Sequence, residues 1–326
     1  MKKMTIASAL LAVLAPGIFT SFLAAEPTGS TVIYGTDDRL DLYQVKSPEL
    51  QKLADSTVGL FRAGDVAIAA GVAALKTDSY SESYKLCPEE PFSNQVTGAF
   101  CSGSLVAPDV IMTAGHCVKD ASGCQNTRFV FGFGVKSEGI MPASVPEAEV
   151  YSCASLIGRE QENAGADWAL IKLDRPVLNH APLKYNTANT LKNGDALLVI
   201  GHPAGLPTKV AGGAAVRDAS PNGYFVANLD TYGGNSGSAV FNARTGLIEG
   251  ILVRGENDYV WKGSCRVSNV CPDTGCRGED ITKLSSVMSY FTGNKGPVKI
   301  AVEKNGLHIA RTPPVFRALE ALSASF

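Results

Sequence analysis

The stretch Gly233-Gly234-Asn235-Ser236-Gly237-Ser238-Ala239-Val240 places a serine between glycines, and apolar residues follow it at once. A serine hydroxyl is a weak nucleophile, so it needs a base that takes its proton and donors that hold the resulting oxyanion. Flanking glycines allow a tight turn in which successive backbone N–H groups point at one spot beside the hydroxyl. Taken alone, the pattern fits both an activated serine and an ordinary surface turn.

Two earlier stretches supply the partners that such a serine needs. Thr113-Ala114-Gly115-His116-Cys117 closes a strand-like apolar run and places a histidine just past its end. Asp167-Trp168-Ala169-Leu170-Ile171-Lys172-Leu173 puts a single acid at the start of another apolar run. A nucleophilic serine requires a base, and the base requires an acid that orients it. The chain therefore contains a candidate base, acid and nucleophile in the order His116, Asp167, Ser236.

In these three motifs and their order, the chain resembles the trypsin-like serine peptidases. The resemblance covers roughly residues 56–291 and is greatest to the bacterial glutamyl-endopeptidase branch, whose nucleophile motif also reads Gly-Asn-Ser-Gly-Ser. It implies catalytic roles for His116, Asp167 and Ser236. It also implies an oxyanion hole formed by the backbone N–H groups of Gly234 and Ser236. The three other histidines, at positions 180, 202 and 308, lie outside these motifs, and we expect no catalytic role for them.

Short apolar runs bounded by Gly, Pro, Asn and Asp recur along the chain and indicate short strands. We predict them at residues 56–61, 104–107, 110–114, 128–133, 149–157, 168–173, 196–201, 224–229, 238–241 and 247–253. The pattern is typical of an all-β barrel or sandwich. The resemblance implies two antiparallel β-barrels with the active site in the cleft between them and a short C-terminal helix, which we expect over residues 281–291.

The ends of the chain differ from the middle. Met1-Lys2-Lys3 precedes an apolar run that ends at Ala24-Ala25-Glu26, which predicts a secretory signal peptide over residues 1–25. A membrane anchor is the alternative, and Pro16 and Gly17 interrupt the run. We expect a leading segment and possible propeptide at 26–55, the peptidase domain at 56–292 and a tail at 293–326. The two barrels would span about 56–188 and 189–292, and the tail would hold a short helix over 315–322.

The eight cysteines all follow the predicted signal peptide, and an even number in an exported chain indicates disulfides. They are Cys87, Cys101, Cys117, Cys124, Cys153, Cys265, Cys271 and Cys276. The family resemblance implies a bridge between Cys101 and Cys117. Cys124 and Cys153 bracket a predicted strand, and we place a second bridge there. The remaining four would form two bridges of open connectivity. Zinc at the last three is the rival interpretation, but their spacing is not Cys-x-x-Cys.

Composition limits the classes of partner. The formal net charge is −2 and no run of Lys or Arg occurs, which argues against nucleic acid. A hydrophobic content of 45% is ample for a large core. We predict protein or peptide substrates, no metal and no cofactor. No second long apolar run follows the signal peptide, so we expect no stable membrane insertion and a periplasmic or extracellular location.

Substrate preference depends on the residues around the nucleophile. We predict a pocket formed by Asp230, Thr231, Leu252 and Arg254. Asp230 stands six residues before Ser236, where the resemblance implies the base of the primary pocket and a preference for Arg or Lys. Glutamyl endopeptidases place a histidine where this chain has Leu252, which argues against cleavage after Glu. Two alternatives stay open, since Asp230 could bond neighbouring backbone or be neutralised by Arg254 at the pocket rim.

Three functions fit the sequence. The first is a secreted serine endopeptidase that acts through an acyl-enzyme. Asn235 replaces the acid that binds a newly cut N-terminus in the digestive enzymes, so we expect no such activation switch. The second is a non-catalytic binding protein on the same fold, which the complete His, Asp and Ser set disfavours. The third is a periplasmic quality-control protease, but residues 293–326 are too few for its peptide-binding domain.

Overall fold

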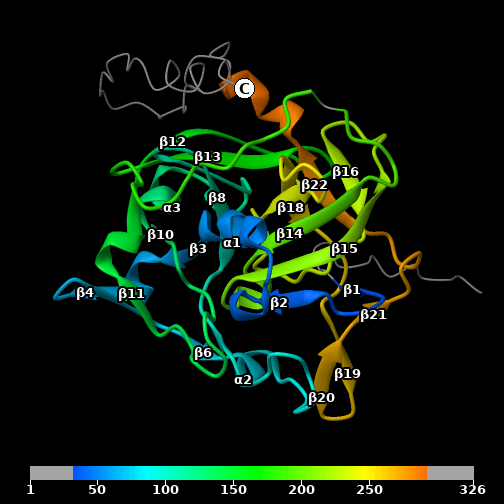
Figure 1. Cartoon of the computed structure of the whole chain (residues 1–326), viewed down its shortest axis with the longest axis horizontal. Coiled ribbons are helices and arrows are strands. Elements are labelled where there is room, and N and C mark those ends of the chain that lie inside the picture. The colour runs from blue at the N-terminus through cyan, green and yellow to red at the C-terminus, as the bar shows by residue number, and fades with distance from the viewer. Residues whose placement is uncertain (1–31, 189, 292–326) are drawn as a thin grey trace, which may run out of the picture.

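Two six-stranded antiparallel barrels, one after the other in the chain, build the molecule (Figure 1). The computed structural model describes residues 32–188 and 190–291. The predicted signal peptide, the predicted tail with its helix and His308 lie outside the described residues. None of the helices in the described ranges is long and apolar enough to cross a membrane. The expectation of an all-β fold with two barrels is confirmed.

The first barrel closes in the order β10-β12-β13-β9-β8-β3. Its strands are β3 (Thr57–Arg62), β8 (Cys101–Ala107), β9 (Val110–Thr113), β10 (Thr127–Val130), β12 (Val150–Gln161) and β13 (Asp167–Leu173). Alternate side chains of these strands fill the interior, where Leu105, Phe129 and Ile171 are fully buried. Each of these strands overlaps a run that the sequence predicts.

The second barrel runs β14-β17-β18-β22-β16-β15, and β15 pairs back with β14 to close it. Its strands are β14 (Ala196–Gly201), β15 (Lys209–Asp218), β16 (Tyr224–Ala227), β17 (Ala239–Asn242), β18 (Ile248–Arg254) and β22 (Glu279–Lys283). A short strand of the leading segment, β2 (Arg39–Asp41), extends this sheet beyond β15. The leading segment therefore joins the second barrel although it precedes the first in the chain.

The sequence analysis does not predict two strands of the second barrel, β15 and β22. β15 contains Gly212 and Gly213 among small residues and presents no continuous apolar run. β22 includes the first three residues of the expected closing helix, so the helix prediction over residues 281–291 is wrong in its first part. β22 bonds to β16 on one side and β18 on the other, and this pairing overrides local preference. Only α4 (Met288–Phe291) remains helical at this end, after η5 (Leu284–Ser286).

Smaller elements decorate the barrels. They are β1 (Ile33–Tyr34), η1 (Leu42–Gln44), α1 (Pro48–Asp55), η2 (Ala63–Asp65), β4 (Val66–Ala69), β5 (Val72–Leu75), β6 (Asp78–Ser79), α2 (Tyr80–Tyr84), β7 (Val96–Thr97), α3 (Ala121–Gln125), β11 (Ser144–Pro146), η3 (Glu147–Glu149), η4 (Pro203–Gly205), β19 (Tyr259–Lys262), β20 (Cys265–Ser268) and β21 (Val270–Cys271). In α1, Ser47 accepts the Leu50 amide and a proline occupies the first turn, which is a favourable helix start.

Four disulfides join all eight cysteines. The predicted bridges Cys101–Cys117 and Cys124–Cys153 are both present. The two bridges of open connectivity are Cys87–Cys265 and Cys271–Cys276. Zinc at the last three cysteines is therefore excluded, because each of their sulfurs is bonded to another sulfur.

One apolar cluster crosses the boundary between the barrels. Met112 and Trp168 of the first barrel and Ile200 and Ile251 of the second all belong to it and are almost completely buried. Burial of this kind fixes the barrels relative to each other. Ala114, Trp168 and Ala239, which lie in or next to the three motifs, belong to this cluster.

Candidate active site

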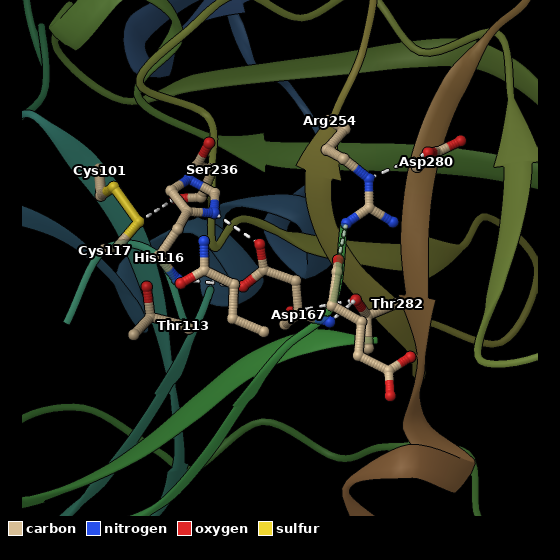
Figure 2. Close-up of polar contacts among 12 residues, drawn as sticks. Cys101, Thr113, His116, Cys117, Asp167, Ser236, Arg254, Asp280 and Thr282 are labelled. Atoms are coloured by element: carbon tan, nitrogen blue, oxygen red, sulfur yellow. Dashed lines mark hydrogen bonds and ion pairs between the residues drawn. A yellow bond between two sulfur atoms is a disulfide. The ribbon is translucent and has the colours of Figure 1, made fainter. Parts of the chain in front are cut away.

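His116 and Asp167 come from neighbouring strands of the first barrel. His116 lies in the turn after β9, and Asp167 is the first residue of β13, which pairs with β9. The Asp167 carboxylate accepts two hydrogen bonds from His116, one from Nδ1 at 2.7 Å and one from the backbone N–H at 3.0 Å (Figure 2). The first bond fixes the ring so that Nε2 is left as the proton acceptor.

Thr282 holds the acid from the other barrel. Its hydroxyl accepts the Asp167 N–H at 3.0 Å and donates to the Asp167 carbonyl oxygen at 3.0 Å (Figure 2). The Asp167 side chain is 4% exposed, whereas the His116 side chain is 29% exposed. The carboxylate is therefore buried behind an imidazole that solvent can reach. Sequence analysis misses Thr282, because its strand is part of the expected helix.

The Ser236 turn has the backbone shape that its glycines allow. Gly234 and Gly237 have φ values of +93° and +91°, in the left-handed region. A Cβ at Gly237 would overlap the Ser102 carbonyl oxygen, and one at Gly234 would lie 2.7 Å from the His202 carbonyl oxygen. Only glycine fits at either position without displacing the backbone of its neighbours.

A residue of the first barrel fixes this turn. The Ser102 backbone N–H donates to the Ser236 carbonyl at 2.8 Å, and its hydroxyl donates to the Gly234 carbonyl at 2.9 Å. Cys117 Sγ lies 3.6 Å from the same Ser236 carbonyl oxygen. These contacts bring the His116 turn and the Ser236 turn together across the barrel boundary (Figure 2).

Two backbone N–H groups beside the serine are available to a ligand. Those of Gly234 and Ser236 donate to no acceptor within the described parts of the chain, although the neighbouring Asn235 N–H donates to the Tyr232 carbonyl at 3.0 Å. Unpaired N–H groups beside a hydroxyl are suited to hold a developing oxyanion.

Asp230 is not the unpaired carboxylate that a basic pocket requires. It is 4% exposed, and its two oxygens accept the backbone N–H groups of Tyr34 at 2.7 Å and Asp38 at 2.9 Å. Burial raises the pKa of Asp230 to about 6, although both amides oppose the shift. Arg254 does not neutralise it either, because its Nε donates to Asp280 at 3.1 Å. Of the alternatives, bonding of Asp230 to backbone matches these contacts.

The other two predicted pocket residues are buried. Leu252 is 1% exposed and packs in the interior of the second barrel with Val240 and Ile281. The Thr231 hydroxyl donates to Glu279 at 3.3 Å, and Glu279 is fully buried. Burial raises the pKa of Glu279 well above its usual range. Sequence analysis does not single out Glu279, because it lies outside the three motifs, three residues after Cys276.

The other two described histidines lie apart from this site. His202 is fully buried, and its Nδ1 donates to the Leu206 carbonyl at 2.9 Å. His180 contacts the carboxylates of Asp55 and Glu149. The described residues contain one cluster with three potential metal-ligand atoms, formed by His116 and its two neighbouring cysteines. Those two sulfurs are joined as the Cys101–Cys117 disulfide, so they are not available as thiolate ligands.

Known proteins similar to this chain match in the same region. Residues 101–251 match the trypsin-like peptidase domain family. Over these residues, which include His116, Asp167 and Ser236, the chain is similar to the trypsin-like peptidases. Within that class, a glutamyl endopeptidase of Bacillus licheniformis is 30% identical over 150 residues, which are 43% of this chain and 45% of the relative.

A second relative is a trypsin-like protease of Streptomyces glaucescens, 38% identical over 91 residues, or 26% of this chain and 32% of that protein. The chain thus matches less than half the length of either relative. Among solved structures, a Glu endopeptidase in complex with MPD has a TM-score of 0.45 at 16% identity, covering 79% of this chain and 96% of that one. The VesB protease of Vibrio cholerae has a TM-score of 0.45 at 14% identity, covering 81% and 67%.

Proposed function

We propose that this protein is a secreted serine endopeptidase with His116, Asp167 and Ser236 as its catalytic residues. The observation that carries the proposal is the Asp167 carboxylate, buried and bonded to His116 Nδ1 at 2.7 Å. This arrangement leaves Nε2 without a proton, so that it can act as the base. A base held in one tautomer is what a serine nucleophile requires.

The reaction follows from these roles. Ser236 Oγ attacks the carbonyl carbon of a peptide bond while its proton passes to His116. The resulting oxyanion accepts hydrogen bonds from the N–H groups of Gly234 and Ser236. The imidazolium then protonates the amine as it leaves, which forms an acyl-enzyme. Water, deprotonated by the same histidine, releases the acid product and restores the hydroxyl.

Reaction with a fluorophosphonate probe tests this proposal. The probe phosphonylates only an activated serine, so the full-length protein should be labelled at Ser236. Ser236→Ala should abolish labelling and lower casein hydrolysis by several orders of magnitude. Ser264→Ala changes an exposed serine outside the site and should leave both unchanged. A folded wild-type protein that is not labelled would instead favour the binding-protein alternative.

For substrate preference, we propose that cleavage does not depend on the charge of Asp230. The preference for Arg or Lys requires that carboxylate to face the substrate, and its two bonds to backbone amides oppose this. The name of the Bacillus relative suggests cleavage after Glu, whereas Leu252 offers no partner for a carboxylate.

A mixed peptide library decides between these preferences. We expect the cleavage pattern of a folded Asp230→Ser variant to match the wild-type pattern, even if its rate falls. If the wild type cleaves after Arg or Lys and Asp230→Ser loses this preference, Asp230 lies at the base of a pocket for basic side chains after all. Cleavage after Glu would require a partner for that side chain other than Leu252.

A further inference from the structure

Residues 32–41, which we call the strap, contact the three consecutive residues that precede the Gly233–Val240 stretch. The strap belongs to the segment that sequence analysis treats as a possible propeptide, yet its β2 pairs with β15 of the second barrel and its β1 pairs with β21 (Figure 1). Its contacts with Asp230, Thr231 and Tyr232 differ in kind, and each bears on whether the segment can be removed.

The contact with Asp230 is made by backbone donors. The N–H groups of Tyr34 and Asp38 donate to its two carboxylate oxygens at 2.7 and 2.9 Å. A buried carboxylate without donors is costly, and hydrogen bonds to a charged group are among the stronger ones. Arg39 of the strap pairs with Asp37, and no salt bridge joins Asp230 to a cation among the described residues. The strap therefore supplies the two donors that this side chain has.

The strap also contacts Thr231 and Tyr232, the two residues that follow Asp230. The Thr231 N–H donates to the Val32 carbonyl at 3.4 Å. The Arg39 guanidinium lies 4.2 Å from the centre of the Tyr232 ring and donates to its hydroxyl at 3.4 Å. Arg39 and Tyr232 are both buried, so this cation–π contact is shielded from water.

The far end of the strap is held by a buried ion pair. Asp41 accepts a hydrogen bond from Lys209 Nζ of β15 at 2.6 Å, and their side chains are 4% and 1% exposed. Gln95 bonds to both, donating to Asp41 at 2.7 Å and accepting from Lys209 at 2.7 Å. Removal of Asp41 would leave a buried ammonium group without its counter-ion, which is strongly unfavourable.

The residues that the strap contacts are bonded to the turn that carries Ser236. The carbonyl of Tyr232 accepts the Asn235 N–H at 3.0 Å, and Ser236 is the next residue. A shift of residues 230–232 would therefore change the backbone on which the Ser236 hydroxyl and its N–H are mounted. A small displacement of a reacting group reduces transition-state stabilisation more than it reduces substrate binding.

We propose that the strap is a permanent part of the enzyme, in which its amides hold Asp230 and so position the turn that carries Ser236. This inference rests on the proposed serine peptidase function. It makes Asp230 a positioning residue. It also limits maturation to cleavage on the N-terminal side of Val32.

The N-terminus of the active protein is the first test. The full-length chain is expressed, and the protein that is exported is labelled with a fluorophosphonate. The labelled species is then identified by intact mass and N-terminal sequencing. We expect every labelled chain to begin at or before Val32. Labelled chains that begin beyond Val32 would overturn the proposal. Absence of any labelling would count against the proposed function, and the strap would then be judged by the stability measurements below.

Asp230→Asn is the second test. The amide keeps one acceptor oxygen but turns an NH₂ group toward the other strap N–H. The matched control is Asp218→Asn, since that carboxylate lies at the end of β15 and bonds to the neighbouring Ser220, outside the strap and the Ser236 turn. Both are made in the full chain and checked for folding by urea unfolding.

We expect Asp230→Asn to lower kcat about tenfold, which corresponds to one hydrogen bond to a charged group, and to leave KM within about twofold. Asp218→Asn should change neither constant. If Asp230→Asn unfolds at lower urea but keeps wild-type kcat, Asp230 only stabilises the fold and its positioning role is wrong. If neither variant reacts with the probe, stability alone decides whether the strap contributes donors to Asp230.

Discussion

At the scale of single residues, the bond between Asp167 and His116 should matter most for the rate. Asp167→Asn keeps the shape of the side chain but presents an NH₂ group where His116 Nδ1 needs an acceptor. The ring then favours the wrong tautomer. We expect kcat to fall by about 10⁴, the loss typical of this change in a Ser-His-Asp triad. Ester hydrolysis measures it, with the exposed Asp174→Asn as control; a loss below tenfold would remove Asp167 from the catalytic residues.

His202 should make the fold sensitive to acid. Burial lowers the pKa of His202 to about 4, because the buried imidazole is favoured in its neutral form. The unfolded chain therefore binds a proton at higher pH than the folded chain does. The stability due to the neutral ring is complete above pH 6.5 and is lost as the pH falls from 6.5 toward 4, by up to about 3 kcal/mol.

Urea unfolding of the wild type and His202→Gln between pH 7 and pH 4 measures this loss. Glutamine keeps a donor at this position and does not titrate, so its stability should fall less steeply over the same range. Carboxylates affect both proteins equally, and the difference between the two slopes isolates His202. Parallel slopes would mean that the pKa of His202 is the same in the folded and the unfolded protein.

At the scale of elements, the disulfides should differ in their contribution to stability. The chain-entropy model links that contribution to the number of residues closed by the bridge. Cys87–Cys265 closes 178 residues, Cys101–Cys117 closes 16 and Cys271–Cys276 closes 5. We expect paired Cys→Ala replacements to cost about 5, 3 and 2 kcal/mol respectively. Urea unfolding under non-reducing conditions gives the order, and a reversed order would contradict the prediction.

The ion pair between β2 and β15 permits a second test of elements. Asp41→Ala leaves Lys209 buried without its partner, and we expect a loss of about 3–5 kcal/mol in the free energy of unfolding. Replacing both residues, as Asp41→Leu with Lys209→Met, should recover most of that loss because no charge remains buried. A single variant as stable as the wild type would show that water reaches Lys209 when Asp41 is absent.

Sequence patterns predict elements well where the pattern is local. Ten apolar runs are enough to place ten of the twelve barrel strands. The sequence pattern does not predict β15, because pairing with β14, β16 and β2 stabilises a strand that has glycines and small side chains. Of the candidate site, the three motifs predict His116, Asp167 and Ser236. The partners of Asp230 lie 196 and 192 residues away, so no local pattern around it could identify them.

At the scale of the whole molecule, the shared core predicts that the barrels unfold together. The chain has two tryptophans, and they lie in contrasting places. Trp168 is 1% exposed in the core that spans both barrels, whereas Trp261 is 61% exposed on β19. In Trp261→Phe, fluorescence therefore reports the barrel boundary alone. We expect its urea transition to coincide with that of far-UV circular dichroism. Separate midpoints would mean that one barrel unfolds before the other.

Ser102 and Thr282 have a consequence for the order in which the protein becomes functional. Ser102, from the first barrel, shapes the Ser236 turn, while Thr282, on the last barrel strand, holds Asp167. Each barrel thus completes the half of the site that the other one carries. A chain still being synthesised, with β22 not yet formed, has all three reactive side chains but not the arrangement that they need. Under the proposed function, hydrolytic activity therefore requires both barrels, and we expect it only after β22 has formed.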